Sequence, residues 1–166
     1  MGAFTYPRSE PGSAGHIDLV ERLQTNSVEL GRLLSSVSDE AASARPSDDE
    51  WSLKEVAGHL ADYARHLHDR LYQIIWLEEP RLAAWDEFEE NAKRDPRAAR
   101  LADLVSELVS QRTETVQMLT DLVHWNWARC GRHEEHGRIS VRQLVDRALA
   151  HDERHLEQVR ALAKTP

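Results

Sequence analysis

The chain has 166 residues, one cysteine and a formal net charge of −8 at pH 7. This length suits one domain with a single hydrophobic core. Because phosphate groups are bound by clustered lysine and arginine, the acidic balance argues against partners such as nucleic acid or an anionic membrane. The lone Cys130 excludes an intramolecular disulfide, and there is no signal-peptide pattern and no apolar run near the ~20 residues that span a bilayer. We therefore expect a cytoplasmic protein.

The first part of the chain predicts a tail and then a helix. Residues 1–15 contain Gly, Pro and Ser and are expected to form a flexible N-terminal tail before one domain at 16–166. Apolar residues at three- and four-residue steps from Ile17 to Val37 predict the first helix. The polar stretch 38–50, which contains Pro46, is interpreted as a connection.

A strong start signal predicts a second, longer helix. Ser52 and Glu55 have the spacing of a capping box, in which each side chain bonds to the backbone N–H of the other residue. Trp51 and Val56 are placed for a hydrophobic staple across this start. The apolar stripe that follows continues until Pro80, which predicts about seven turns at ~3.6 residues each.

The remainder of the chain predicts two more helices. The acidic and aromatic segment 81–95 leaves a short helix and a packed loop as alternatives. After Pro96 the stripe resumes and predicts a third helix, although it thins around Gln111 and Thr115. The stretch "HWNWARCGRHEEHG" breaks the rhythm and is expected to be a loop. Ser140 and Gln143 form a second capping box before the last helix. Four amphipathic helices without strand-like alternation predict an all-α bundle and no sheet.

Three of the nine histidines lie where they could bind one metal ion. His151 and His155 are four residues apart in the last helix, so their Cβ atoms lie ~5–6 Å apart on one side of it. His59 lies on the flank of the apolar stripe near the start of the second helix. Three imidazoles would leave coordination positions open for water or substrate, as in catalytic rather than closed structural sites. These residues therefore predict a reactive metal site.

Neighbouring residues have simpler alternatives to a role in this site. His66, two turns after His59, could be a fourth or supporting ligand, but a hydrogen-bonded boundary role is preferred. His68 is expected to be solvated. Tyr63 could direct its hydroxyl into the site as a proton donor, yet a core tyrosine with a satisfied hydroxyl is preferred.

A second cluster, Cys130, His133 and His136, follows a three-residue spacing that zinc could accept. A closed site needs a fourth ligand, which Glu134 or Glu135 would have to supply. An exposed loop is therefore preferred, with His136 at the edge of the cavity as an alternative.

Three carboxylates of the last helix are expected to be solvated or paired with neighbouring arginines, although one of them could orient a ligand ring. They are Asp152, Glu153 and Glu157, with Arg147, Arg154 and Arg160 as the candidate partners. The chain also lacks a nucleophile elbow, a phosphate-binding glycine loop and a dinucleotide fingerprint, which excludes those enzyme classes.

Two blocks resemble the signature regions of the DinB-like (DinB/YfiT) superfamily. These are "RPSDDEWSLKEVAGHLADYARH" at 45–66 and "HEEHGRISVRQLVDRALAHDERHLEQV" at 133–159. The family pattern is a tryptophan-led capped helix that carries a histidine, and a final helix with a His-x-x-x-His pair followed by a glutamine. The resemblance covers about Ile17 to Leu162 but is only compositional in the first and third helices.

This resemblance implies a four-helix bundle of up-down-down-up order, often a homodimer, with a divalent metal bound by His59, His151 and His155. Nickel and zinc are the first expectation for the metal, with iron and manganese as alternatives. Some members of the superfamily carry out transfer or isomerisation with a low-molecular-weight thiol.

The function expected from these observations is that of a metal-dependent enzyme acting on a small molecule, either a thiol-dependent S-transferase or a hydrolase. The alternative is a non-enzymatic, stress-associated dimer that binds a small ligand, with a structural metal or none. The substrate, the catalytic residues and the native metal stay open.

Overall fold

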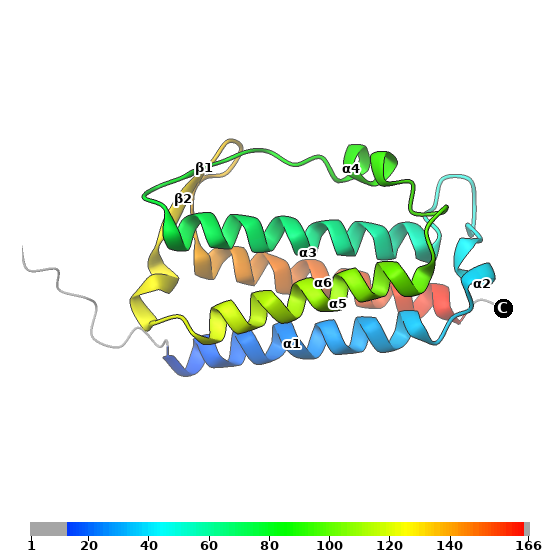
Figure 1. The fold of residues 1–166 in the computed structure, drawn as a ribbon, viewed down its shortest axis with the longest axis horizontal. Helices are drawn as coiled ribbons and strands as arrows, with labels where there is room; N and C mark the ends of the chain where they lie inside the picture. Colours follow the sequence, from blue (N-terminus) through cyan, green and yellow to red (C-terminus); the bar gives the residue numbers. More distant parts are fainter. Residues whose placement is uncertain (1–12, 165–166) are drawn as a thin grey trace, which may run out of the picture.

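The computed structural model describes residues 13–164 and is dominated by four long helices. They are α1 (Ser13–Ser35), α3 (Leu53–Trp76), α5 (Leu101–Thr120) and α6 (Val141–Ala163). They lie side by side, with α1 and α6 running in one direction and α3 and α5 in the other (Figure 1). The predicted all-α bundle of up-down-down-up order is confirmed. No helix among residues 13–164 is long and apolar enough to cross a membrane.

The winding order determines which helices meet. Both α1 and α3 pack against α5 and α6, so α3 and α6 are antiparallel neighbours. Because α3 and α5 follow one another and are parallel, the chain must return along the bundle between them. This return segment, residues 77–100, carries the short strand β1 (Arg81–Leu82) and the helix α4 (Glu87–Arg94) along the outer side of α3 (Figure 1). The segment for which sequence left two alternatives therefore contains a short helix.

Both predicted capping boxes are present. Glu55 N donates to Ser52 Oγ at 3.3 Å and Ser52 N donates to the Glu55 carboxylate at 2.8 Å. The matching distances between Ser140 and Gln143 are 3.1 and 2.9 Å. The first helix begins at Ser13, four residues before the predicted start at Ile17, because residues 13–16 (Ser-Ala-Gly-His) carry no large apolar side chain that the periodicity could mark. The rest of the predicted tail, residues 1–12, lies outside the described residues.

The prediction of no sheet was wrong. The strands β2 (Cys130–His133) and β3 (Gly137–Ser140) form an antiparallel hairpin, and β1 pairs with β2 in parallel. Strands of two to four residues are too short to show alternation. Gly137 has φ +68° directly after the three-residue loop, a conformation that a side chain disfavours and that such hairpins use. The supposed loop is therefore an ordered hairpin.

Two short helices were also not predicted from the sequence. The helix α2 (Asp39–Ser43) lies in the expected connection and is capped by Ser38, whose side chain accepts a hydrogen bond from Ala41 N. A 3-10 helix at His124–Ala128 precedes β2. Both are single turns or little more, and apolar periodicity needs longer windows than these to be visible.

The core consists of two apolar clusters, one toward each end of the bundle. Leu23, Leu71 and Leu149 belong to the cluster near the sheet, and Leu34 and Leu104 to the other. On α1, α5 and α6 the residues between these clusters are buried and polar: Ser27, Arg112, Thr115, His151 and Asp152. Because buried polar groups destabilise a core unless they are paired, this mid-bundle layer is where a functional site is expected.

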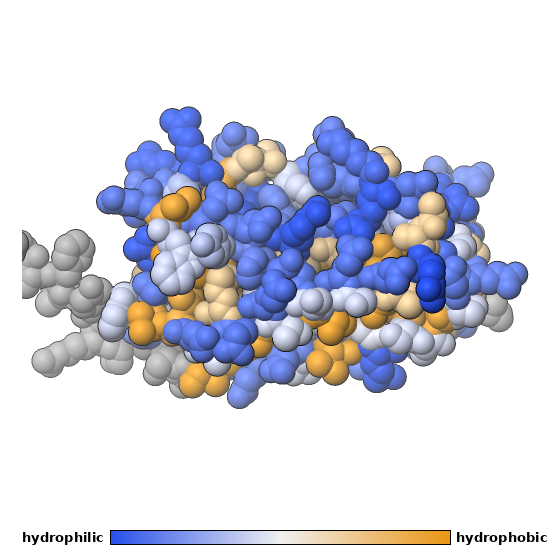
Figure 2. Space-filling model, viewed as in Figure 1, coloured by the Kyte–Doolittle hydropathy of each residue, from blue (hydrophilic) through white to orange (hydrophobic). Residues whose placement is uncertain are grey.

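The surface is unevenly polar. Figure 2 shows hydrophilic side chains over most of the upper half of one face, with apolar side chains along the lower edge, where α1 runs. Ile17 and Val28 of α1 are each 61% exposed. The homodimer implied by the family resemblance stays a prediction.

Candidate metal centre

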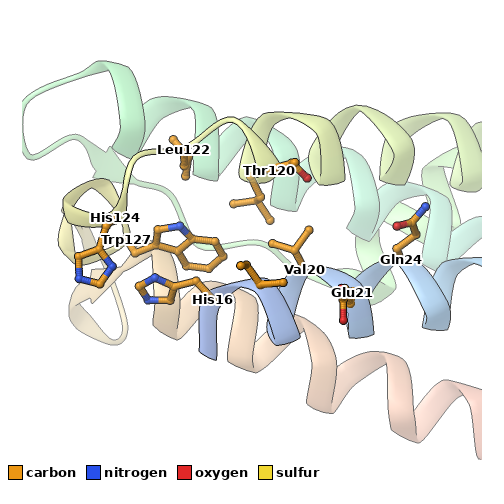
Figure 3. A pocket seen from close by; sticks show the side chains of 10 residues that line it. His16, Val20, Glu21, Gln24, Thr120, Leu122, His124 and Trp127 are labelled. Carbon is orange, nitrogen blue, oxygen red and sulfur yellow. The ribbon is translucent and has the colours of Figure 1, made fainter. Parts of the chain in front are cut away.

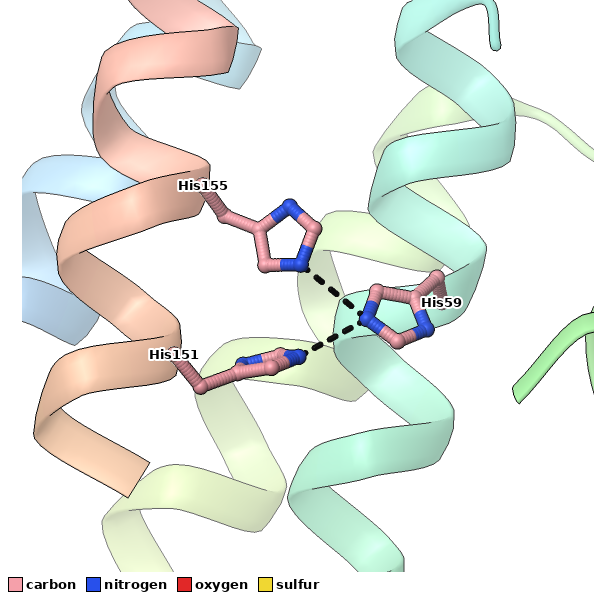
Figure 4. A group of neighbouring side chains, drawn as sticks. All are labelled: His59, His151 and His155. Carbon is pink, nitrogen blue, oxygen red and sulfur yellow. Dashed lines mark hydrogen bonds between the residues drawn. The ribbon is translucent and has the colours of Figure 1, made fainter. Parts of the chain in front are cut away.

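Three histidine side chains converge between α3 and α6 (Figure 4). His59 Nε2 lies 2.8 Å from His151 Nε2 and 3.1 Å from His155 Nε2. His59 and His151 are buried and His155 is partly buried. The structure therefore brings together the three residues that the sequence predicted to share a site.

The helices explain this convergence. His151 and His155 occupy successive turns on the face of α6 that meets α3, as their four-residue spacing requires. His59 lies two turns after the capped start of α3, and the antiparallel packing of the two helices brings this level of α3 to the middle of α6. Helix register, rather than loop conformation, thus sets the positions of all three rings.

The hydrogen bonds of the rings suit a metal ligand set. His155 Nδ1 lies 2.8 Å from Gln158 Oε1, which can only accept, so Nδ1 carries the proton and the lone pair of Nε2 faces the cluster. The Nδ1 atoms of His59 and His151 are buried without a hydrogen-bond partner among the described residues. Neutral imidazoles have one N–H each, so ring-to-ring hydrogen bonds cannot use every lone pair at this point. A divalent transition metal fits three converging imidazole nitrogens.

Burial keeps these rings neutral. It lowers the pKa of His59 to about 3, a shift to which His151 and His155 add, and it lowers the pKa of His151 to about 2, a shift to which His155 adds. Burial also lowers the pKa of His155. Since a histidine must be unprotonated to bind a metal, the site is in its binding form at neutral pH.

Aromatic rings surround the cluster. Tyr63 stacks on His151 with ring centroids 3.7 Å apart, and burial raises its pKa to about 12, so its hydroxyl keeps its proton. Trp85, from the return segment, lies against His59 at 5.9 Å and against His66 at 4.9 Å. His66 therefore packs beside Trp85 rather than within the cluster. The prediction for His68 was wrong, because its Nδ1 lies 3.1 Å from Thr115 Oγ1 in a partly buried position.

Sequence reasoning missed Glu87, the first residue of α4. Its Oε2 lies 3.6 Å from His59 Nε2, and it is the only carboxylate among the described residues within 4.0 Å of a converging Nε2 atom. Asp86 caps α4 by accepting hydrogen bonds from Phe88 N and Glu89 N, both at 3.0 Å. The Asp-x-x-Glu spacing from Asp86 to Glu89 is a helix-start signal that could have indicated α4, although not its position over His59.

The buried ion pair between Arg112 and Asp152 was also missed. Arg112 Nη2 donates to Asp152 Oδ1 at 2.6 Å, and the expectation of a solvated Asp152 was wrong. Burial raises the pKa of Asp152, and the Arg112 guanidinium opposes this shift. Glu153 is exposed and pairs with Arg22 at 2.8 Å, in line with a surface role.

The second predicted cluster, Cys130, His133 and His136, does not form one group in the structure. His133 Nδ1 accepts hydrogen bonds from the backbone N–H groups of Glu135 and His136, at 3.1 and 3.3 Å. A neutral His133 therefore carries its proton on Nε2, which removes the second lone pair that a metal would need. Cys130 Sγ donates to Ala128 O at 3.3 Å and does not join the group formed by His133, Glu135 and His136. These contacts favour a structural role for His133 in the hairpin turn.

Two cavities of different charge reach the histidine cluster. His155 lines a cavity of about 380 Å³ together with Trp51, Glu87 and Phe88. His151 lines another of about 580 Å³ together with Tyr63 and several arginines. One histidine of the cluster thus lines each cavity, which gives a substrate two possible routes to the cluster. His136 lines neither of these cavities.

A third cavity, of about 460 Å³, lies at the end of the bundle where α1 meets the 3-10 helix (Figure 3). Its walls are mainly apolar, and the His16 ring stacks on Trp127 with centroids 4.3 Å apart. No group of three metal-ligating side chains lies there among residues 13–164. This cavity therefore lacks the chemistry of the histidine cluster.

The family model of the DinB superfamily matches residues 22–159 of this chain. The chain belongs to the DinB superfamily. The matched region contains α3, most of α6 and all three clustered histidines.

Two curated relatives align with most of the chain. One, from Oceanobacillus iheyensis, is named "Putative metal-dependent hydrolase OB0413" and is 23% identical over 141 residues, which cover 85% of this chain and 81% of that protein. The other is the uncharacterized protein YuaE of Bacillus subtilis, 26% identical over 141 residues, with 78% and 87% covered.

The solved structure of YfiT from Bacillus subtilis has the same fold, with a TM-score of 0.84 and 18% identity over 96% of this chain and 91% of that one. YfiT is described as a probable metal-dependent hydrolase with an unusual four-helix bundle topology. The likeness shows that this chain shares the fold of YfiT.

Proposed function

We propose that the protein is a metal-dependent hydrolase of a small molecule, with His59, His151 and His155 as the ligands of one divalent ion. The observation that carries this proposal is the approach of three imidazole Nε2 atoms to 2.8 and 3.1 Å at the meeting point of two cavities. The name of the Oceanobacillus relative supports it. Nickel and zinc are the first candidates for the ion, followed by iron and manganese.

A divalent ion bound by three histidines would act as a Lewis acid, lowering the pKa of water at its open positions and polarising a substrate carbonyl. The side chains of this chain would supply the rest. Gln158 holds the His155 ring through the 2.8 Å contact at Nδ1, which keeps Nε2 available. The stacked Tyr63 and Trp85 rings limit the access of bulk water to His151 and His59.

Glu87 is the proposed proton acceptor for the attacking water. Its carboxylate is 44% exposed and lies 3.6 Å from His59 Nε2, close enough to share a water with the cluster. Tyr63 lines the cavity beside His151, and its raised pKa keeps the hydroxyl protonated, so that it could donate a hydrogen bond or a proton to the substrate. Proton acceptance and proton donation would thus come from the two different cavities.

The experiment compares metal content and hydrolysis in three proteins purified without an affinity tag: wild type, His151→Ala and His136→Ala. The third is the matched control, because His136 is an exposed histidine outside the cluster. Each protein is analysed for transition metals and assayed against a panel of esters and amides after loading with nickel, zinc, iron or manganese. We expect about one ion per chain and hydrolysis in wild type and His136→Ala, and neither in His151→Ala.

Other results would redirect the proposal. Turnover only when a low-molecular-weight thiol is added would replace hydrolysis by thiol transfer at the same site. Stoichiometric metal with a large stabilisation against heat, but without turnover, would indicate a structural metal in a ligand-binding protein. A wild type that cannot be loaded with any of the four metals would refute the metal site.

A further inference from the structure

The cavity beside His151 contains an unusual concentration of positive charge for an acidic protein. Arg70, Arg147 and Arg154 line it together with Tyr63 and His151. On α6, Arg147, His151 and Arg154 follow a four- and three-residue spacing and so share one face of that helix.

None of the three arginines is neutralised by a close carboxylate. Of the ion pairs within 4.0 Å that involve residues 13–164, none includes Arg70, Arg147 or Arg154. Most other arginines have such a partner, including Arg112 with Asp152 and Arg94 with Asp62. Arginines that line a cavity and have no close acidic partner can bind an anionic ligand.

The acidic residues of the same cavity do not cancel this charge. Glu153 and Glu157 also line it, but Glu153 is already paired with Arg22 at 2.8 Å. Three guanidinium groups therefore face one carboxylate that is not engaged elsewhere. The positive charge also reaches the cluster, since Arg154 lowers the pKa of His59 and His151.

Of the three arginines, Arg70 is the one whose side chain is held by a hydrogen bond to the backbone. Its Nη2 donates to Ala83 O of the return segment, which holds the side chain against the bundle. Its Nε is buried and has no hydrogen-bond acceptor among the described residues. An N–H group in this situation destabilises the protein unless an acceptor reaches it, and an anion in the cavity could be that acceptor.

We infer that Arg70, Arg147 and Arg154 form a subsite for an anionic group, a carboxylate or a phosphate, and hence that the substrate is a small anionic molecule. This inference rests on the proposed function for the reaction, but the binding of an anion does not depend on it. The subsite would hold the anionic group on the Tyr63 and His151 side, so that the group to be cleaved lies at the three histidines. The opposite cavity, with Glu87, would be left for water.

The test uses calorimetric titration of the whole protein with succinate, with inorganic phosphate and with neutral succinamide, all at one ionic strength. The variants are Arg147→Gln/Arg154→Gln, whose two side chains are exposed and do not support the core, and Arg160→Gln. Arg160 is an exposed arginine of the same helix that lies outside the cavity and pairs with Glu29, so its variant is the matched control. Metal content is measured in every sample, and His155→Ala is titrated as a cluster variant.

We expect succinate or phosphate to bind at least tenfold more tightly than succinamide to wild type and Arg160→Gln, and the double variant to lose at least tenfold of this affinity with its metal content unchanged. The tighter of the two anions identifies the source of the anionic group. Equal affinity for anion and succinamide, or equal loss in the control, would overturn the inference. So would binding that disappears in His155→Ala but survives in the double variant, because the anion would then bind at the histidines. Arginine-dependent binding without any metal would support the subsite and refute the metal site.

Discussion

Arg112 and Asp152 form an ion pair of 2.6 Å in the middle of the bundle, with side chains that are 1% and 0% exposed. Asp152 directly follows His151, so the pair fixes the backbone of α6 next to one of the clustered histidines. Asp152 Oδ1 also lies 3.9 Å from His151 Nδ1, too far for a hydrogen bond. The pair therefore links α5 to α6 across the interior of the bundle, directly beside the cluster.

Arg112→Met should lower the free energy of unfolding by about 3–5 kcal/mol, because it leaves the Asp152 carboxylate buried without its partner. Urea unfolding followed by circular dichroism measures this loss. The double variant Arg112→Met/Asp152→Leu should recover part of the stability, because it removes both charges. A double variant no more stable than Arg112→Met would contradict the role assigned to the pair.

Gln158→Leu should weaken metal binding by about 10–100-fold, the usual effect of removing the group that orients a histidine ligand. The reason is that His155 Nδ1 loses its acceptor at 2.8 Å and the ring is then free to turn. Competition with a chelator measures the dissociation constant. Gln117→Leu makes the same chemical change at an exposed position of α5 and should leave metal affinity unchanged. Equal affinity in wild type and Gln158→Leu would remove Gln158 from the site.

Stability should fall in acid through Glu55. Hydrogen bonds from Arg45, and from the backbone and hydroxyl of Ser52, lower the pKa of Glu55 from 4.5 to about 2 despite its burial. A carboxylate whose pKa is lower in the folded protein stabilises the fold above its unfolded pKa, and this contribution disappears as the pH falls from about 4.5 toward 2. Glu55→Gln should therefore be less stable than wild type at pH 6, with a difference that shrinks across this interval.

Thermal unfolding between pH 2 and pH 7 measures that difference. Asp103→Asn is the control, because Asp103 is exposed and belongs to none of the ion pairs of the described chain. Its stability should follow the wild-type curve. A Glu55→Gln curve parallel to that of wild type from pH 2 to pH 6 would show that Glu55 has no lowered pKa.

Gly58→Ala should destabilise the protein although alanine favours helices. A Cβ atom at this position of α3 would lie 2.6 Å from Pro96 Cβ, so the return segment would have to move. We expect an overpacking cost of about 1–3 kcal/mol, partly offset by the gain of about 0.5–1 kcal/mol in helix propensity. Gly15→Ala is the matched control, because its Cβ would come no closer than 3.7 Å to Arg142. Chemical denaturation should show a stable Gly15→Ala and a weakened Gly58→Ala, and the reverse order would contradict this packing.

The parts of the molecule that could be predicted are those that depend on residues close together in the sequence. Ser52 with Glu55 and Ser140 with Gln143 mark the starts of the two helices that carry the histidines, and the apolar stripes then set which faces meet. The convergence of the cluster follows from these two registers. Whether the cluster binds a metal stays a prediction for the experiment above.

The parts that could not be predicted depend on contacts between distant segments. The thinning of the third apolar stripe around Gln111 and Thr115 is where the buried Arg112 lies, but its partner Asp152 is 40 residues away. Glu87 and Trp85 reach His59 because the return segment packs onto α3, where Pro96 lies against Gly58 and Arg94 pairs with Asp62. The sequence of residues 81–95 shows no periodicity from which the position of this segment over His59 could be predicted.

The parallel direction of α3 and α5 has a consequence for how such a protein can diversify. A helix of 24 residues is about 36 Å long at 1.5 Å per residue, and the chain must travel back over this distance before α5 can start. In doing so it passes over His59 with Trp85 and Glu87. Insertions or substitutions there would reshape the entrance to the histidines without shifting the register of the helices that hold them. The entrance beside Trp85 and Glu87 and the three histidines thus belong to separate stretches of the chain, which can change independently.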